Sequence, residues 1–190
     1  MSEAAEHAVD AVDAVDAADA VGPATTVRVD LVDPEATRAY GRSLAGVLRP
    51  GDLVVLTGAL GSGKTTLTQG LGEGLGVRGQ VASPTFIIAR VHPSLTDGPP
   101  LVHVDAYRLG SMEELDALDL DAGLEESVTV VEWGEGLVEV LAEDRLEVVI
   151  ERPHGGLEAT GEVLDAEVGV RHVTVTGIGP RWAGVTLPTG

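Results

Sequence analysis

The glycine-rich stretch at residues 58–66 restricts the folds open to this chain more than any other feature, and it reads GALGSGKTT. Gly58, Gly63, Lys64 and Thr65 within it match the pattern G-x-x-x-x-G-K-[S/T]. An apolar segment precedes the stretch and a helix-forming segment follows it. In this context the glycines let the backbone curl, so that successive N–H groups point at one anion and the helix N-terminus adds partial positive charge. The pattern therefore predicts a phosphate-binding loop between a strand and a helix, rather than an ordinary glycine-rich turn.

The residue types of this loop indicate a bound nucleoside triphosphate with Mg²⁺. We expect the Lys64 ammonium to reach the β- and γ-phosphates and the Thr65 hydroxyl to bind Mg²⁺. Lys64 is also the only lysine in a chain with 12 basic residues, the others being arginines. A compact ammonium on a flexible stem fits inside a tight loop where a planar guanidinium does not. The loop residues expected to bind the nucleotide are Gly58, Leu60, Gly61, Ser62, Gly63, Lys64, Thr65 and Thr66.

Strand-like and helix-like segments alternate along the rest of the chain. Extended segments are expected at 25–33, 52–58, 81–91, the start of 101–109, 127–133, 145–151 and 167–177, and helices at 33–48, 64–75, 111–120 and 134–141. This alternation predicts an α/β protein with a three-layer fold like that of P-loop NTPases. We expect a mostly parallel sheet with helices on both faces and an antiparallel C-terminal hairpin at its edge.

The 190 residues are enough for one globular domain, which we place at residues 25–190. Residues 1–24 carry six acids and no lysine or arginine, in a crude Ala-Val-Asp repeat of period three that matches neither a helix stripe nor strand alternation. This composition predicts a disordered acidic tail. The alternative is a transient helix that docks on a partner.

The formal net charge of −19 argues against direct binding of DNA or RNA, because an acidic surface repels phosphate backbones. Any nucleic acid in this protein's function is therefore expected to be held by a partner. The chain has no cysteine, which excludes disulfides and thiolate chemistry. It contains no apolar run long enough for a membrane span, and its N-terminus is acidic where a secretory signal is basic, so we expect a cytoplasmic protein.

Two acids follow apolar strand-like segments downstream of the loop. Asp105 comes after LVHV and Glu132 after VTVV. Because parallel strands present their carboxyl ends at one edge of a sheet, both acids are expected beside the phosphate-binding loop, in catalytic or metal-binding positions. Spacing alone leaves open which of them contacts Mg²⁺. Each acid taken singly is also compatible with a solvated strand end.

The segment SPTF at residues 83–86 lies where many nucleotide hydrolases have a switch. Its Thr85 hydroxyl is a candidate for sensing the γ-phosphate or the attacking water, and a plain Ser-Pro turn is the alternative. His103 lies inside a strand-like segment, which favours a core or structural role over a catalytic one.

The nucleotide is expected to be ATP. The chain has no asparagine, so the Asn-Lys-x-Asp motif by which many P-loop proteins read guanine is absent. A P-loop small-molecule kinase is the main alternative function, and a nucleotide-gated binding module is another. Kinases of that class usually carry an arginine-bearing lid. Arg90 and Arg108 are available here, but no stretch resembles a basic lid.

Four motifs in order, GALGSGKTT, SPTF, HVDAYRL and VEWGE, make the chain resemble the TsaE (YjeE) family. The resemblance covers about residues 27–152. Members of this family are bacterial ATPases of weak intrinsic activity that serve the threonylcarbamoyladenosine modification at position 37 of tRNAs. The resemblance implies TsaD and TsaB as partner proteins, which make the modified base, and ATP hydrolysis that resets their complex between turnovers.

The same resemblance implies roles for individual residues. Thr65 and Glu132 would hold Mg²⁺, Asp105 would lie near the water that attacks the γ-phosphate, and SPTF would be the switch. Trp133 would lie near the nucleotide or a partner surface, and Thr37 near the adenine. The chain departs from the family at Ala59, where an aspartate is common. That position contributes backbone to the loop, so nucleotide binding is expected to survive the change.

Overall fold

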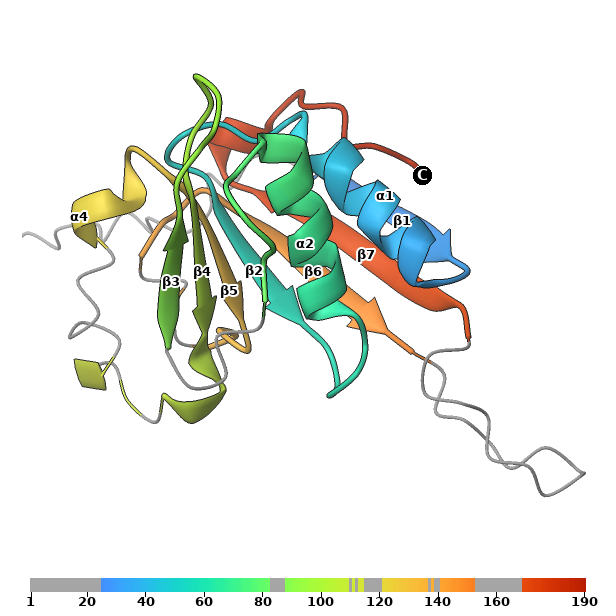
Figure 1. The fold of residues 1–190 in the computed structure, drawn as a ribbon. Coiled ribbons are helices and arrows are strands. Elements are labelled where there is room, and N and C mark those ends of the chain that lie inside the picture. Colours follow the sequence, from blue (N-terminus) through green and yellow to red (C-terminus); the bar gives the residue numbers. More distant parts are fainter. Residues whose placement is uncertain are drawn as a thin grey trace, which may run out of the picture.

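The computed structural model describes residues 25–82, 88–109, 111, 113–114, 121–136, 138, 141–152 and 169–190 (Figure 1). The predicted tail at 1–24 and the candidate switch residue Thr85 lie outside the described residues. Within the described part of the chain, no helix has the length and apolar character needed to cross a membrane.

A seven-stranded sheet organises the molecule, with its strands in the order β1-β7-β6-β2-β5-β4-β3. The strands are β1 (Thr25–Leu31), β2 (Leu53–Thr57), β3 (Ala89–His92), β4 (Leu101–Asp105), β5 (Val128–Glu132), β6 (Arg145–Glu151) and β7 (Arg171–Ile178). The four central strands β6, β2, β5 and β4 run parallel, while β3, β7 and β1 each pair antiparallel with their neighbours. The predicted α/β fold with a mostly parallel centre is confirmed.

The C-terminal pair of strands does form an antiparallel hairpin, but it does not form the edge of the sheet. Strand β1 pairs along the outer side of β7, with Thr25 opposite Gly177 and Leu31 opposite Arg171. Without β1, the N–H and C=O groups on that side of β7 would lack sheet partners. The first strand of the domain therefore closes the sheet beside the last one.

Helix α1 (Pro34–Ala45) begins as its sequence indicates. The Asp33 side chain accepts a hydrogen bond from the Ala36 N–H at 2.7 Å, and proline occupies the first helical position. This is the arrangement that satisfies otherwise unpaired N–H groups of a first turn.

Helix α2 (Lys64–Leu75) begins at the glycine loop and ends at Gly76, whose left-handed backbone terminates it. Its bounds are those predicted from the sequence. Helices α1 and α2 lie side by side over one face of the sheet (Figure 1). The other regular elements are α4 (Asp121–Leu124) and two 3₁₀ turns at Ala106–Arg108 and Pro180–Trp182.

Two further helix predictions have different outcomes. Of the helix expected at 111–120, the structure describes only three residues, and there the Glu114 N–H donates to Ser111 Oγ at 3.3 Å, as a helix cap would. The described residues of 134–141 form turns and not the expected helix. Gly134 and Gly136 at the start of that segment favour a turn, because glycine loses more backbone entropy than other residues in a helix.

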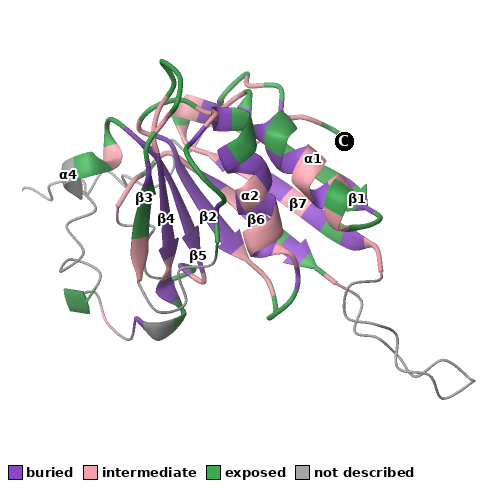
Figure 2. Ribbon diagram, viewed as in Figure 1, coloured by how far each residue is buried: buried purple, intermediate pink, exposed green. Residues whose placement is uncertain are grey.

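The central strands are largely buried, as the purple ribbon in Figure 2 shows, and buried apolar residues form one cluster on each face of the sheet. Val54 and Leu56 of β2 pack toward α1 and α2, whereas Leu53 and Val55 belong to a second apolar cluster on the opposite face. That second cluster is completed by residues of β4, β5 and the turns that follow them, including Leu109 and Val138.

This alternation also orients the ends of β4 and β5. Leu101, Val128 and Val130 belong to the cluster beneath α2. Because strand side chains alternate with period two, His103 and Glu132 point toward the same face. Asp105 lies two residues after His103 on β4 and shares that side. The sheet thus directs three polar side chains toward the start of α2.

Candidate nucleotide-binding site

The glycine loop connects β2 to α2 through three residues with left-handed or otherwise positive φ: Gly58 at 155°, Gly61 at 75° and Gly63 at 114°. A Cβ atom on Gly58 would also lie 2.5 Å from the Ile150 carbonyl oxygen and 2.7 Å from Ser62 Oγ. Glycine is therefore required at position 58 for space as well as for conformation. The N-cap residue of α2 is Gly63, which has no side chain to cap the helix, so the first N–H groups of α2 can face an anion.

The other loop residues contribute mainly backbone. Leu60 is 92% exposed, and Thr66 is half-buried at the start of the helix. Ser62 is buried, and its N–H donates to the Ala59 carbonyl oxygen at 3.0 Å. The carbonyl of Ala59 thus closes the turn.

Lys64 is 4% exposed and folds back into the loop. Its Nζ donates to the carbonyl oxygens of Gly58 at 2.7 Å and Ala59 at 3.1 Å, and it lies 3.8 Å from the centroid of a Trp133 ring. Burial lowers the pKa of the Lys64 ammonium below its ordinary value, and the carboxylates of Glu132 and Asp105 oppose that shift. The ammonium is therefore enclosed by carbonyl oxygens and an aromatic face, where a phosphate oxygen would be a stronger partner.

Trp133 follows β5 directly and has a φ of 64°, the only positive φ of a non-glycine residue in the described ranges. Its N–H donates to the Leu56 carbonyl oxygen at 3.1 Å. The ring also meets that of Tyr107 edge to face, with centroids 5.3 Å apart. A left-handed backbone is rare for a bulky residue and costs free energy. Here it brings the indole over the lysine of the loop, close to where a nucleotide is expected.

Thr65 and Glu132 meet at the start of α2. The Thr65 Oγ1 hydroxyl donates to Glu132 Oε1 at 3.0 Å, across 67 positions of sequence. His103 Nε2 contacts the same carboxylate oxygen at 2.9 Å. A hydroxyl and an imidazole therefore meet at one carboxylate beneath the loop. Glu132 is also buried.

Asp105 lies beside Glu132, as predicted, because the two residues are partners in the parallel pairing of β4 and β5. Its Oδ1 accepts from the Tyr107 N–H at 3.1 Å and so caps the 3₁₀ turn that follows β4. Asp105 is half-buried, whereas Glu132 is buried and carries the contact to Thr65.

Thr37 of α1 lies against the far side of the loop. It is buried, its Oγ1 donates to the Asp33 carbonyl oxygen at 2.9 Å, and its methyl carbon is 3.7 Å from the point that a Cβ on Gly63 would occupy. Arg171 of β7, buried at 4% exposure, approaches the same point with Nε at 3.9 Å.

The sequence reasoning missed Arg171 altogether and did not connect His103 with Glu132. For His103 a signal was present, since it lies two residues before Asp105 and period-two alternation predicts the same face for both. No local signal marks Arg171, because its strand pairs with β1 and β6, far from the loop in sequence.

These residues fit a nucleoside triphosphate with Mg²⁺. The glycine backbone forms a cradle that a side chain at position 58 would fill, and a hydroxyl and a carboxylate lie 3.0 Å apart at its edge. Among the described residues, no group of three or more histidine, cysteine, aspartate or glutamate side chains is arranged to hold a metal alone. Mg²⁺ needs no such group, because it is usually bound by one or two protein oxygens together with phosphates and water.

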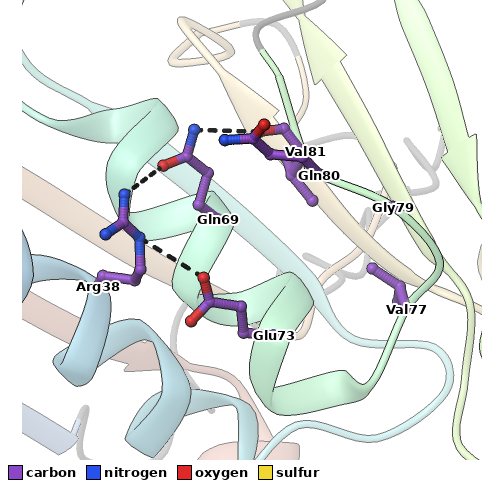
Figure 3. A pocket seen from close by; sticks show the side chains of 7 residues that line it. All are labelled: Arg38, Gln69, Glu73, Val77, Gly79, Gln80 and Val81. Atoms are coloured by element: carbon purple, nitrogen blue, oxygen red, sulfur yellow. Dashed lines mark hydrogen bonds and ion pairs between the residues drawn. The ribbon is translucent and has the colours of Figure 1, made fainter.

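A separate cleft of about 430 Å³ is lined by Arg38 of α1, by residues of α2 and by residues of the segment at 77–81 (Figure 3). Arg38 Nη2 donates to Gln69 Oε1 at 3.0 Å, and Gln69 Nε2 donates to the Val81 carbonyl oxygen at 3.1 Å. These bonds attach the segment before residue 83 to both helices. None of the predicted site residues lines this cleft.

Comparisons with known proteins identify relatives of this chain. Residues 31–158 match the family model "TsaE: Threonylcarbamoyl adenosine biosynthesis protein TsaE". A protein of Streptomyces coelicolor named tRNA threonylcarbamoyladenosine biosynthesis protein TsaE is 66% identical over 147 residues, which cover 77% of this chain and 93% of that protein. The protein of the same name from Bacillus subtilis is 38% identical over 157 residues, covering 80% of this chain and 85% of the relative.

Among solved structures, that of YdiB from Bacillus subtilis is similar, with a TM-score of 0.62 and 32% sequence identity. The match covers 85% of this chain and 92% of YdiB. The resemblance predicted from the four motifs is thereby confirmed. By this family match and these relatives, the chain belongs to the TsaE family of threonylcarbamoyl adenosine biosynthesis proteins.

Proposed function

We propose that this protein binds and hydrolyses ATP with Mg²⁺ as an accessory protein of the threonylcarbamoyl modification of adenosine 37 in tRNA. Its hydrolysis resets a TsaD–TsaB complex between turnovers. The observation that carries the proposal is the 3.0 Å contact between Thr65 and Glu132 at the edge of the glycine loop. This contact joins a loop hydroxyl to a strand-end carboxylate, the pair of oxygen ligands with which P-loop hydrolases hold Mg²⁺.

In this proposal the loop backbone and the N-terminus of α2 bind the phosphates. Lys64 exchanges the carbonyl oxygens of Gly58 and Ala59 for phosphate oxygens as the nucleotide enters. Thr65 would hold the metal through its hydroxyl, released from Glu132, and Glu132 would hold it through its carboxylate. Bound Mg²⁺ neutralises charge on the β- and γ-phosphate oxygens.

The remaining site residues have more peripheral roles in the proposal. Asp105 orients the attacking water, and the bond from the Tyr107 N–H holds its carboxylate at the end of β4. Thr85 senses the γ-phosphate from the switch segment. Trp133 lies beside the nucleotide once the Lys64 ammonium has moved from the Trp133 ring to the phosphates. Thr37 lies toward the adenine.

The partner assignment is supported by charge as well as by family. The relatives are named for the biosynthesis of a tRNA modification. A chain with a net charge of −19 repels RNA phosphates, so we propose that TsaD and TsaB hold the tRNA and that this protein contacts it only through them. We also propose a cytoplasmic location, which membership of a tRNA-modification family supports.

Phosphate release from ATP, measured with and without purified TsaD and TsaB, tests this function. We expect slow release alone and faster release with both partners. A phosphorylated small molecule among the products would instead establish the kinase alternative. ATP binding with no phosphate release, even with the partners present, would establish a nucleotide-gated binding module.

The assignment of the metal ligand is tested by two variants. Glu132→Ala should lose Mg²⁺-dependent hydrolysis, while Asp105→Ala should hydrolyse slowly but keep the Mg²⁺ dependence of nucleotide binding. His92→Leu, which removes a buried histidine from the neighbouring strand β3, is the matched control and should hydrolyse normally. If Asp105→Ala loses the Mg²⁺ dependence and Glu132→Ala retains it, the two roles are reversed.

A further inference from the structure

His103 is a fully buried imidazole in direct contact with the proposed metal ligand. Its Nε2 lies 2.9 Å from Glu132 Oε1, and its side chain is 0% exposed. The hydroxyl of Thr65 donates to that same oxygen. Among the described residues, no hydrogen bond reaches the other carboxylate oxygen, Oε2.

The contact determines which ring nitrogen carries a hydrogen. A carboxylate only accepts hydrogen bonds, so Nε2 must be the donor. Nδ1, at the other side of the ring, is buried and has no hydrogen-bond partner in the described part of the chain. The imidazole is therefore held by one hydrogen bond, and this bond is to Glu132.

Packing alone does not account for a histidine at this position. Its neighbours beneath α2 include Leu101, Val128 and Val130, and an aliphatic side chain would continue that apolar layer. A buried imidazole with an unpartnered nitrogen is less favourable there than an aliphatic side chain, because the polar atom loses its water. The hydrogen bond to Glu132 is the contact that compensates for the cost of burying this imidazole.

We infer that His103 is a positioning residue for Mg²⁺ binding. By donating to Oε1 it fixes the carboxylate of Glu132 and leaves Oε2 for the cation. Thr65 shares Oε1 in this structure, so when the Thr65 hydroxyl turns to the metal, His103 alone restrains the carboxylate. The inference rests on the proposed function, in which Thr65 and Glu132 bind the metal. A donor that holds a metal-binding carboxylate without touching the metal typically changes metal affinity by about 10–100-fold.

The test compares ADP affinity, measured by calorimetry, in excess EDTA and in saturating Mg²⁺. His103→Gln and His103→Asn are the informative pair, because the glutamine amide reaches about as far as Nε2 whereas the asparagine amide stops near Nδ1. We expect His103→Asn to reduce the gain in affinity from Mg²⁺ by about tenfold. His103→Gln should keep most of that gain, and both should bind ADP in EDTA as the unmodified protein does. His92→Leu should leave both affinities unchanged.

Three results would overturn the inference. The first is that His103→Asn keeps the full gain in ADP affinity from Mg²⁺. The second is that the Gln and Asn variants lose the same share of that gain. The third is that His103→Asn loses as much ADP affinity in EDTA as in Mg²⁺, which would indicate only a damaged fold. The Glu132→Gln variant distinguishes a wrong role for His103 from a wrong metal ligand in the proposed function. If Glu132→Gln loses the Mg²⁺ gain while His103→Asn keeps it, the metal site stands and His103 does not position it. If neither variant changes the gain, the metal assignment itself is wrong.

Discussion

Lys64 occupies a space that is matched to an ammonium group. Its Nζ is bonded to two carbonyl oxygens of its own loop and lies over the Trp133 ring, at 4% exposure. A guanidinium is planar and carries five N–H donors in a fixed fork, more than two carbonyl oxygens and an aromatic face can satisfy. A chain that otherwise uses only arginine therefore has a physical reason to keep a lysine here.

We predict that Lys64→Arg retains the positive charge but loses at least tenfold in ADP affinity. The guanidinium would displace the loop or the indole, and neither displacement places a donor where Nζ reaches. Calorimetry with ADP measures the loss, and circular dichroism melting checks that the fold is kept. Wild-type affinity in Lys64→Arg would show that charge alone matters at this position.

Tyr40 provides a prediction about pH. It is buried in α1, its hydroxyl donates to the Pro188 carbonyl oxygen at 3.1 Å, and burial raises its pKa to about 12. In the unfolded chain a tyrosine ionises near pH 10, so above that pH the folded state binds more protons than the unfolded one. The contribution of Tyr40 to stability is therefore lost as pH rises from about 10 toward 12.

Urea unfolding between pH 7 and 11.5 measures this effect as the difference in free energy of unfolding between the wild type and Tyr40→Phe. At neutral pH the variant should lose about 1 kcal/mol, the usual value of one hydrogen bond. Above pH 10 the difference should shrink, because only the wild type carries the group that ionises on unfolding. A constant difference across the whole range would contradict the assignment.

At the scale of elements, the close approach of α1 and α2 supports the start of α2. A Cβ on Gly41 would collide with the Leu67 carbonyl oxygen, and one on Gly70 would collide with the Arg38 carbonyl oxygen. Two glycines thus let the helices touch backbone to backbone, which brings Thr37 of α1 against Gly63 of the loop. The separation of the two helices consequently affects the shape of the site.

Gly70→Ala should destabilise the protein by about 2 kcal/mol, because the added methyl forces the helices apart. Alanine is the better helix former by about 1 kcal/mol, so any destabilisation comes from packing and not from propensity. Thermal and urea unfolding measure the change. Gly123→Ala in α4 is the control, since its Cβ would meet no atom within 4 Å, and it should be neutral or slightly stabilising.

At the scale of the whole molecule, a buried ion pair joins the C-terminal region to the start of β2. Arg181 donates from Nε to Asp52 Oδ1 at 2.9 Å and from Nη2 to Asp52 Oδ2 at 2.8 Å, with both side chains under 10% exposed. Asp52 also accepts from the Arg49 N–H at 2.8 Å. The family match ends at residue 158, yet β7 and Arg181 lie beyond it, and β7 joins β6 to β1 in the sheet.

Breaking this pair should be costly. Asp52→Ala leaves a buried guanidinium without its carboxylate, and we expect a loss of about 3–5 kcal/mol in urea unfolding. Arg181→Leu should cost a similar amount. The double variant should lose clearly less than the sum of the two, because it leaves no unpaired charge. Additive losses would indicate that the two residues act independently.

The local parts of the fold and site were predictable from the sequence. The glycine loop, the bounds of α2 and the Asp33 cap depend on residues within a few positions of one another, and each agrees with its pattern. The arrival of Asp105 and Glu132 at one edge followed from parallel strands and period-two alternation. These features depend on backbone sterics and hydrogen bonding that neighbouring residues determine.

Other features were decided only by the tertiary structure. The pairing of β1 with β7 joins positions about 150 residues apart, and it places Arg171 beside Gly63. The hydrogen bonds of Thr65 and His103 to Glu132 span 67 and 29 positions. Long-range contacts of this kind depend on how strands and helices pack, which no local pattern encodes. The sequence by itself thus determined the glycine loop before α2 and the acids that face it, and the packing of the sheet decided which side chains hold those acids in place.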